Sequence, residues 1–315
     1  MIELLIQAAI LASSLTILAV ASFFAIKYVE DLMELTRLSE IAAGFAILSV
    51  MTTLPELMVA SFAVLQGRAG ISIGDILGSH VFNIGVVVGL LAAFGSLKTC
   101  GTTSLVELVD LLFLASLIPL LLVIFKINSP LVGIVLIAIF IFSLYRISKR
   151  RAPASADVER VFLKKIEPKR TVPSTIAITI VAAVVVVITA RFVILSASEI
   201  INLLNVSTVV MGAKIVAIGT SLPELAFGFA AMKRGRVHLA LGDAVGANLT
   251  TITLVLGLVL VFSPFIIDLA SFVEILAFVL VMNLVLWRFL TKGGVSQMGG
   301  IVLIMMYILF QAILQ

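Results

Sequence analysis

Long apolar runs alternate with short polar stretches along the whole chain. Each run is close to the roughly 20 residues that an α-helix needs to cross the hydrocarbon core of a bilayer. We therefore expect ten transmembrane helices, near residues 2–27, 38–65, 71–95, 104–126, 129–147, 173–198, 207–232, 238–262, 265–290 and 296–314. No basic segment precedes the first run, which favours a spanning helix over a cleavable signal. The pattern predicts an all-α transmembrane fold.

Composition gives the same class. Hydrophobic residues make up 62% of the 315 and charged residues 12%, with a mean hydropathy of +1.29. An ordinary soluble domain is roughly 45–50% apolar and about 25% charged. The surplus apolar surface must face lipid, so the bilayer is the first expected partner.

The distribution of basic residues predicts the topology. A polar, basic stretch at 148–172 separates two five-helix halves, 1–147 and 173–315. The positive-inside rule places this linker in the cytoplasm and both termini outside. With that topology, 17 of the 21 Lys and Arg residues lie on the cytoplasmic side. The net charge of +4 thus reflects membrane orientation, and no nucleic-acid partner is expected.

The two halves contain an internal repeat. Residues 44–90 align without a gap on residues 212–258, and 17 of the 47 pairs are identical, among them a shared TxLPEL and a shared GDxxG. Because each half has an odd number of helices, the second half enters the membrane in the opposite sense. Inverted repeats are typical of secondary transporters, whose substrate sites lie at mid-membrane where the repeats meet.

Each repeat carries the motif Thr-x-Leu-Pro-Glu inside an apolar run, at residues 52–56 and 220–224. A proline within a helix removes one backbone hydrogen bond and clashes with the carbonyl four residues earlier. We expect an interrupted helix whose freed carbonyls lie beside the hydroxyls of Thr52, Thr53, Thr220 and Ser221. Irregular backbone at membrane depth is tolerated where it lines a polar cavity, and its carbonyls can coordinate cations.

Glu56 and Glu224 end the two motifs and are expected at mid-membrane. A charge there costs roughly 2.5–3.5 kcal/mol on insertion scales. Two neighbouring carboxylates also repel each other, so either one is protonated or a cation neutralises the pair. Hard cations such as Ca²⁺, Na⁺ and Mg²⁺ prefer oxygen ligands, which are what this site offers. The alternative, a structural kink with a snorkelling glutamate, is disfavoured because the motif recurs at the same register.

The second part of each repeat is rich in small and polar residues. Glycines four apart allow close helix contact, and three polar side chains follow that either face the cation or join helices: Ser79, Asn83 and Thr251. Asp75 and Asp243 lie two turns earlier. They either stabilise a helix N-terminus or form a secondary cation or proton site.

Two further polar residues lie inside spans. Lys214 has Ala46 as its repeat mate, and we expect it to snorkel to the outer interface; the alternative is an ion pair with a carboxylate near the site. His80 is expected to be a packed helix residue rather than a ligand. A single cysteine and two histidines are too few for a cysteine or histidine metal cluster.

These motifs resemble those of a known family. GTSLPEL at 219–225 and TTLPEL at 52–57 resemble the alpha repeats of the calcium/cation antiporter superfamily, which includes sodium/calcium and proton/calcium exchangers. GDILGSHVFNIG at 74–85 is similar to that family's GNxxGSxxxNIG. The resemblance implies ten helices in two inverted five-helix repeats and antiport of cations.

The resemblance also implies a set of ligands. Glu56 and Glu224 match the family's two central Ca²⁺-binding glutamates. The other matching positions are the side chains of Thr52, Thr53, Ser79, Asn83, Thr220 and Ser221 and the backbone carbonyls of Ser49 and Ala217.

The second repeat departs from the pattern of the sodium/calcium exchangers. Ala247 and Thr251 stand where those proteins have Ser and Asp, and Asp75 and Asp243 replace the Asn that follows the glycine. These changes weaken the expectation of three Na⁺ sites around one Ca²⁺. They leave two central carboxylates, which is what proton/calcium exchangers use.

The leading hypothesis is a secondary transporter of the cell membrane, not an enzyme, that exchanges Ca²⁺ for Na⁺ by alternating access without a cofactor. The alternatives are H⁺-coupled exchange of Ca²⁺ or another divalent such as Mg²⁺ and, more remotely, a cation channel. The chain has no HExxH or nucleotide-binding motif, which disfavours a metalloprotease and an ATP-driven pump. Inorganic cations are the expected partners, and a monomer is the working expectation.

Overall fold

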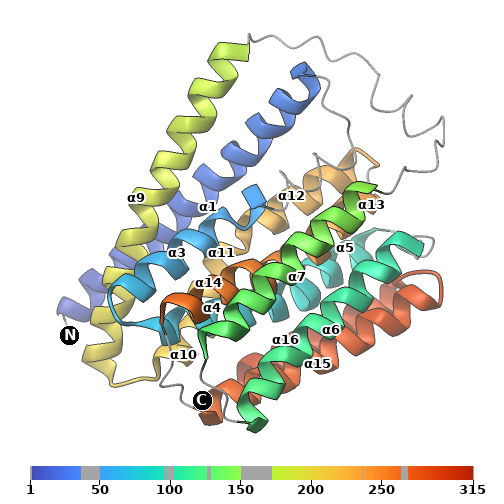
Figure 1. Cartoon of the computed structure of the whole chain (residues 1–315). Coiled ribbons are helices and arrows are strands. Elements are labelled where there is room, and N and C mark those ends of the chain that lie inside the picture. Colours follow the sequence, from blue (N-terminus) through green and yellow to red (C-terminus); the bar gives the residue numbers. More distant parts are fainter. Residues whose placement is uncertain are drawn as a thin grey trace.

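The computed structural model describes residues 2–36, 50–95, 97, 103–125, 129–149, 172–235, 237–263 and 269–314. Within these ranges the chain is helical almost throughout (Figure 1) and contains no strand. A single β-bridge, in which the Val295 N–H donates to the Leu97 carbonyl at 3.0 Å, ties two loops together in the described part of the chain.

The helices fall into two series of the same order. The first is α1 (Ile2–Thr36), α3 (Leu54–Leu65), α4 (Ala69–Phe82), η1 (Asn83–Val88), α5 (Gly89–Phe94), α6 (Thr103–Phe125) and α7 (Pro130–Lys149). The second is α9 (Val172–Leu204), α10 (Thr208–Met211), η2 (Gly212–Val216), α11 (Ala217–Thr220), α12 (Leu222–Lys233), α13 (Val237–Thr250), η3 (Thr251–Val255), α14 (Leu256–Phe262), α15 (Leu269–Thr291) and α16 (Gln297–Ile313). Shifting the bounds of α3 and α4 by 168 residues reproduces those of α12 and α13.

Six of the described helices are long and apolar enough to cross a membrane, at 2–28, 69–94, 172–204, 208–233, 237–262 and 272–291, and shorter apolar helices cover 54–65, 130–146 and 297–313. Helices occupy the predicted spans in sequence order, the fourth being α6, which is not among these nine. Residues 38–49 of the second predicted span, 126 of the fourth and 265–268 of the ninth lie outside the described residues. α1 continues to Thr36, beyond the predicted end at 27, because hydropathy marks where a helix leaves the lipid rather than where the helix stops.

The first helices of the two series, α1 and α9, pack against each other along their length and run in opposite directions (Figure 1). This is the inversion that the odd number of helices predicts. α4 and α13 are the most buried of the six spans and form the centre of the molecule. The fold is therefore an all-α transmembrane bundle of two inverted five-helix repeats.

The two halves also interlock. α16 of the second half covers α5 of the first, and α7 of the first covers α14 of the second. Glycines permit both close approaches: a Cβ on Gly89 would lie 3.1 Å from the Gly300 carbonyl oxygen, and one on Gly257 would lie 2.9 Å from that of Gly133. Each repeat is thus completed by the last helix of the other.

Both spans with the Pro-Glu motif are interrupted where the prolines predict. Thr53 (φ −85°, ψ 6°) and Ser221 (φ −92°, ψ 2°) leave helical geometry by the same amount, and α3 and α12 begin at the next residue. Proline then occupies the first turn of the new helix, where its missing N–H costs little. The breaks place two helix N-termini inside the bundle.

Candidate cation site

Glu56 and Glu224 lie in the first turns of α3 and α12, directly after the two breaks. Both side chains are 0% exposed, and within the described residues neither oxygen of either carboxylate has a hydrogen-bond partner. The free N–H groups and partial positive charge of a helix N-terminus offset a negative charge there only in part. Two buried carboxylates without partners therefore require protons or a bound cation.

Asp75 and Asp243, in α4 and α13, bring two more buried acids close to the glutamates. Glu56 is near enough to be repelled by Glu224, Asp75 and Asp243. Among the described residues, however, no three acidic, cysteine or histidine side chains converge at the distance of metal ligands. A single ion would therefore need hydroxyl, amide and carbonyl oxygens between the carboxylates.

The interpretation of the two aspartates as helix N-terminal residues is wrong. α4 begins at Ala69 and α13 at Val237, and neither has an acidic residue in its first turn. Asp75 instead accepts a hydrogen bond of 2.8 Å from the hydroxyl of Thr220, one of the predicted ligands of the opposite repeat. Asp75 thus belongs to the same polar region as the second Pro-Glu motif.

Close packing of α4 on η2 brings Asp75 and Thr220 together. A Cβ on Gly74 would lie 2.8 Å from the backbone nitrogen of Ala213, and one on Gly78 would lie 2.6 Å from its Cα. The predicted packing role is confirmed for Gly74 and Gly78, whereas a Cβ on Gly242, the repeat mate of Gly74, would meet nothing within 4 Å. Only the absence of side chains at Gly74 and Gly78 lets α4 come this close to the interrupted helix.

The other predicted hydroxyl ligands are buried, and most donate to a carbonyl of their own helix. Thr53 donates to Val50 at 3.3 Å, Ser79 to Ile76 at 3.0 Å and Thr251 to Asn248 at 3.0 Å. A hydroxyl that donates in this way keeps oxygen lone pairs for a cation. The other two predicted hydroxyls, those of Thr52 and Ser221, are 0% exposed.

Of the two predicted carbonyl ligands, those of Ser49 and Ala217, the structure describes the second. The Ala217 carbonyl accepts weakly from the Thr220 hydroxyl at 3.3 Å and from the Ser221 N–H at 3.2 Å. The second of these is a regular helix hydrogen bond at the end of α11, and the role of this carbonyl as a ligand stays a prediction. Ser49 lies outside the described residues.

Asn83 stands at the start of η1 and is fully buried. Its side-chain NH₂ donates to Oδ1 of Asn248 at 3.0 Å, and the NH₂ of Asn248 donates to the backbone carbonyl of His80 at 3.2 Å. The Oδ1 atom of Asn83 has no hydrogen-bond partner among the residues that the structure describes. η1, which begins at Asn83, packs against α12, the helix that carries Glu224.

Sequence reasoning missed Asn248 and Asn283, although a polar side chain within a span was a usable signal. The Nε2 atom of His80 lies 2.8 Å from Oδ1 of Asn283, whose NH₂ donates to the Ser116 hydroxyl at 2.9 Å. His80 is thus a packed residue that joins α4 to α15, as expected. Lys214, in η2, is partly buried and makes no ion pair within the described part of the chain.

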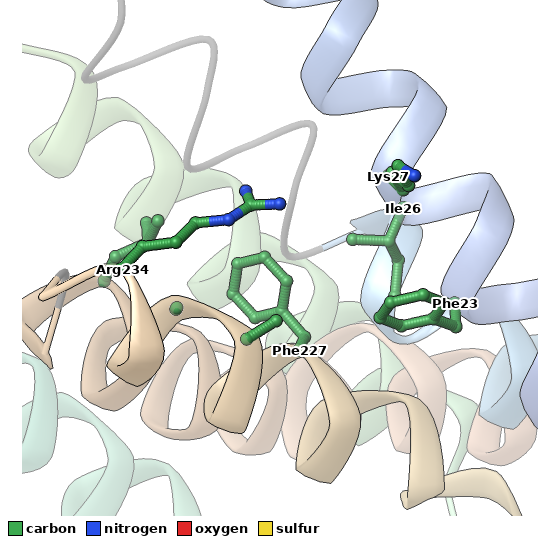
Figure 2. Close-up of a pocket in the computed structure, with 8 residues that line it drawn as sticks. Phe23, Ile26, Lys27, Phe227 and Arg234 are labelled. Carbon is green, nitrogen blue, oxygen red and sulfur yellow. The ribbon is translucent and has the colours of Figure 1, made fainter. Parts of the chain in front are cut away.

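Space remains between α1 and α12. A cavity of about 80 Å³ lies near the C-terminal end of α12 (Figure 2), where Arg234, the residue after that helix, reaches past Phe227 toward Ile26 and Lys27 of α1. A wider apolar groove of about 550 Å³ continues along the same helices as far as Leu222. At the corresponding contact in the other repeat, buried side chains of α9 such as Val193 and Ala197 form a continuous core with Val59 and Ala63 of α3.

The fold and these residues define a polytopic membrane protein of two inverted repeats with buried carboxylates between them, the architecture of secondary transporters. The family model described as sodium/calcium exchanger protein matches residues 6–149 and 174–314, once in each half. The chain belongs to this family, which lies within the calcium/cation antiporter superfamily.

Similar proteins include an uncharacterised membrane protein of Methanocaldococcus jannaschii, MJ0091, which is 29% identical over 280 residues covering 87% of this chain and 86% of the relative. Among solved structures, the sodium-calcium exchanger NCX_Mj superposes with a TM-score of 0.67 at 25% identity, over 99% of this chain and 100% of that one. The H⁺/Ca²⁺ exchanger CAX superposes with a TM-score of 0.77 at 18% identity, over 96% of this chain and 81% of that one, and shows the fold alone.

Proposed function

We propose that this chain is a secondary antiporter that exchanges Ca²⁺ for Na⁺. The observation that carries the proposal is the pair Glu56 and Glu224, one from each repeat, both fully buried and both without a hydrogen-bond partner in the described part of the chain. Such carboxylates are costly inside a membrane unless an ion occupies the site. They supply the negative charge for the cation, with further oxygens from Thr52, Thr53, Thr220, Ser221, Ser79, Asn83, Thr251 and the carbonyls of Ser49 and Ala217.

Exchange follows from competition for one site. A divalent ion neutralises both glutamates, whereas monovalent ions must occupy the site together to do so. The empty, doubly charged site is the least stable state in a buried environment. If only neutralised states change access from one side to the other, each Ca²⁺ that leaves must be replaced by counter-ions, and the two fluxes are coupled.

The contacts of α1 and α9 support alternating access. The α1–α12 contact contains the cavity and groove, while the α9–α3 contact is filled by a hydrophobic core. Because the repeats are symmetric, we expect the inward-open and outward-open states to differ in which of the two contacts, α1–α12 or α9–α3, is closely packed. We propose that α1 and α9 move together and exchange the two arrangements.

H⁺-coupled exchange is the second candidate, and a specific observation favours it. Thr251 carries no charge and its hydroxyl donates to a carbonyl of its own helix, so the second repeat offers less negative charge than a set of Na⁺ sites requires. Asp75 and Asp243 add two buried acids that could carry protons. The cargo in either case is Ca²⁺, with Mg²⁺ as the divalent to test next.

The proposal includes a topology. Residues 1–147 and 173–315 are the two repeats, the linker 148–172 is cytoplasmic, and both termini lie outside the cell membrane. Labelling of single cysteines introduced at residue 2 and in the linker of a Cys100→Ser protein, in intact cells and in inverted vesicles, tests this arrangement. Labelling of the linker in intact cells contradicts it.

The experiment that tests the function is ⁴⁵Ca²⁺ uptake into proteoliposomes loaded with Na⁺, or loaded at low pH, and diluted into buffer without the gradient ion. Uptake driven by Na⁺ supports the first candidate, and uptake driven only by H⁺ supports the second. E224Q protein, which keeps the shape of the side chain and removes its charge, is the negative control. Uptake under neither gradient, with Ca²⁺ or with Mg²⁺, overturns the proposed function.

A further inference from the structure

A directed chain of hydrogen bonds ends at Asn83. It begins at the backbone carbonyl of His80 in α4, passes through the side chain of Asn248 in α13 and reaches the side chain of Asn83 at the start of η1. His80 and Asn248 occupy equivalent positions of the two repeats, 168 residues apart. All three residues are 0% exposed, so no solvent competes for these bonds.

The chemistry of the groups fixes the direction of the chain. A backbone carbonyl only accepts, so Asn248 must turn its NH₂ group toward His80 and its Oδ1 atom toward Asn83. That oxygen also only accepts, so Asn83 must present its NH₂ group to Asn248. The Oδ1 atom of Asn83 then takes no part in the chain, and it has no hydrogen-bond partner within the described ranges.

The position of His80 is held independently. Ser116 donates its only hydroxyl proton to the Leu112 carbonyl at 2.7 Å, so it accepts from the Asn283 NH₂ group, and Oδ1 of Asn283 in turn accepts from the His80 ring. The carbonyl that orients Asn248 therefore belongs to a residue anchored to α15 and α6. The orientation does not depend on a single flexible contact.

We propose that Asn248 is a positioning residue that turns the amide oxygen of Asn83, rather than its NH₂ group, toward the cation. The inference rests on the proposed function, because it concerns a ligand of the same site. Residues that orient metal ligands typically contribute 10- to 100-fold to metal affinity. A reversed Asn83 would place a hydrogen-bond donor against a cation, which is repulsive.

The test compares N248L in three backgrounds. In the otherwise unchanged protein, N248L has a similar volume but no hydrogen bonds, and we expect the KM for Ca²⁺ to rise about tenfold with a smaller change in kcat. In N83D, both terminal atoms are oxygens, so orientation no longer matters and N248L should change KM less than about threefold. N83T copies the residue that the second repeat has at this position, and again N248L should add little.

A role in packing alone gives a different result. N248L would then lower transport by the same factor in all three backgrounds, and that outcome overturns the inference. T250V is the matched control: it removes a buried hydroxyl of the same helix that donates to the Gly246 carbonyl at 2.9 Å and takes no part in the chain through Asn248, and its effect should be equal in the Asn83 and N83D proteins. N83D and N83T are independent backgrounds. If one of them does not fold, the other alone shows whether the effect of N248L depends on Asn83.

The proposed function can fail separately. If E224Q transports normally, or if the unchanged protein neither transports nor binds Ca²⁺, both proposals fall. If E224Q is inactive while N248L keeps the original KM, the function stands and only the role of Asn248 is wrong.

Discussion

The two repeats have the same backbone at their breaks but different side chains in the space between them. Thr53 and Ser221 adopt almost the same dihedral angles, and α3 and α4 have the same bounds as α12 and α13 after the shift of 168 residues. In the next helices the side chains differ: Ser79 aligns with Ala247, and Asn83 aligns with Thr251. The two repeats are therefore symmetric at the helix breaks that position the glutamates, and they differ at the positions of the other proposed ligands.

This difference separates two roles. Symmetry at the breaks is needed because both repeats must deliver a carboxylate to one place and exchange conformations. The lining is free to diverge, because the identity of the counter-ion depends on how many oxygens and charges surround the pair. His80 and Asn248 show the divergence most clearly: one is anchored to α15 through its ring, the other to Asn83 through its amide.

The largest effect is expected from the symmetric part. E56Q and E224Q each remove one of the two central carboxylates from a buried site, so each should lower Ca²⁺ uptake at least about 100-fold while the protein still folds. Uptake assays with thermal unfolding as a folding control measure this. A stable variant that keeps most of its Ca²⁺ uptake would contradict the functional equivalence of the two glutamates.

The next largest effect is expected at Thr251, where the two repeats differ. T251D adds a carboxylate to the second repeat, where the sodium/calcium exchangers have one, and should raise Na⁺-dependent ⁴⁵Ca²⁺ uptake about tenfold, since ligand charge sets cation affinity. T251N is the control, because it matches Asn83 in shape and adds no charge. Equal Na⁺ dependence in both variants would mean that charge at this position does not select the counter-ion.

A smaller effect is expected at the contact between the repeats. T220V removes the donor that bonds Oδ1 of Asp75 at 2.8 Å and should raise the KM for Ca²⁺ by a few-fold up to about tenfold. T220S retains the hydroxyl and should restore most of the affinity. If T220S is as impaired as T220V, the methyl group matters and the hydrogen bond does not.

The smallest effect concerns the interlock of the halves. G257A and G300A each place a Cβ against a backbone carbonyl of the facing helix, so each should lower the free energy of unfolding by about 1–3 kcal/mol and the Tm by a few degrees. G228A is the control, because its Cβ would meet only movable side-chain atoms of Leu91, at 3.2 Å, and Val87, at 3.5 Å. Unequal losses in the two interlock variants would show that the halves are not equivalently packed.

The sequence predicted the fold because lipid imposes strong rules. Apolar length, the repeat and the basic loops defined ten helices in two inverted halves, and Pro55 and Pro223 located the breaks within one or two residues. The pattern also singled out the buried glutamates, because charge is rare at mid-membrane.

The sequence did not reveal the partners across helices. The bond between Thr220 and Asp75 depends on glycines that let α4 approach η2, and nothing in the local pattern states which helices meet there. Asp75 was assigned in one interpretation to a helix N-terminus because it lies two turns before Asn83, but α4 begins six residues earlier than Asp75, at Ala69. Asn248 was missed because its role lies in an orientation, which residue type alone does not encode.

The central claim is that Glu56 and Glu224 form one shared cation site. Equilibrium ⁴⁵Ca²⁺ binding to the purified protein, compared with E56Q and E224Q under the same conditions, tests it most directly. We predict a single class of Ca²⁺ site in the unchanged protein, competed by the counter-ion, and no saturable binding in either variant. Saturable Ca²⁺ binding of unchanged affinity in either variant would contradict the claim, because each glutamate would then act without the other.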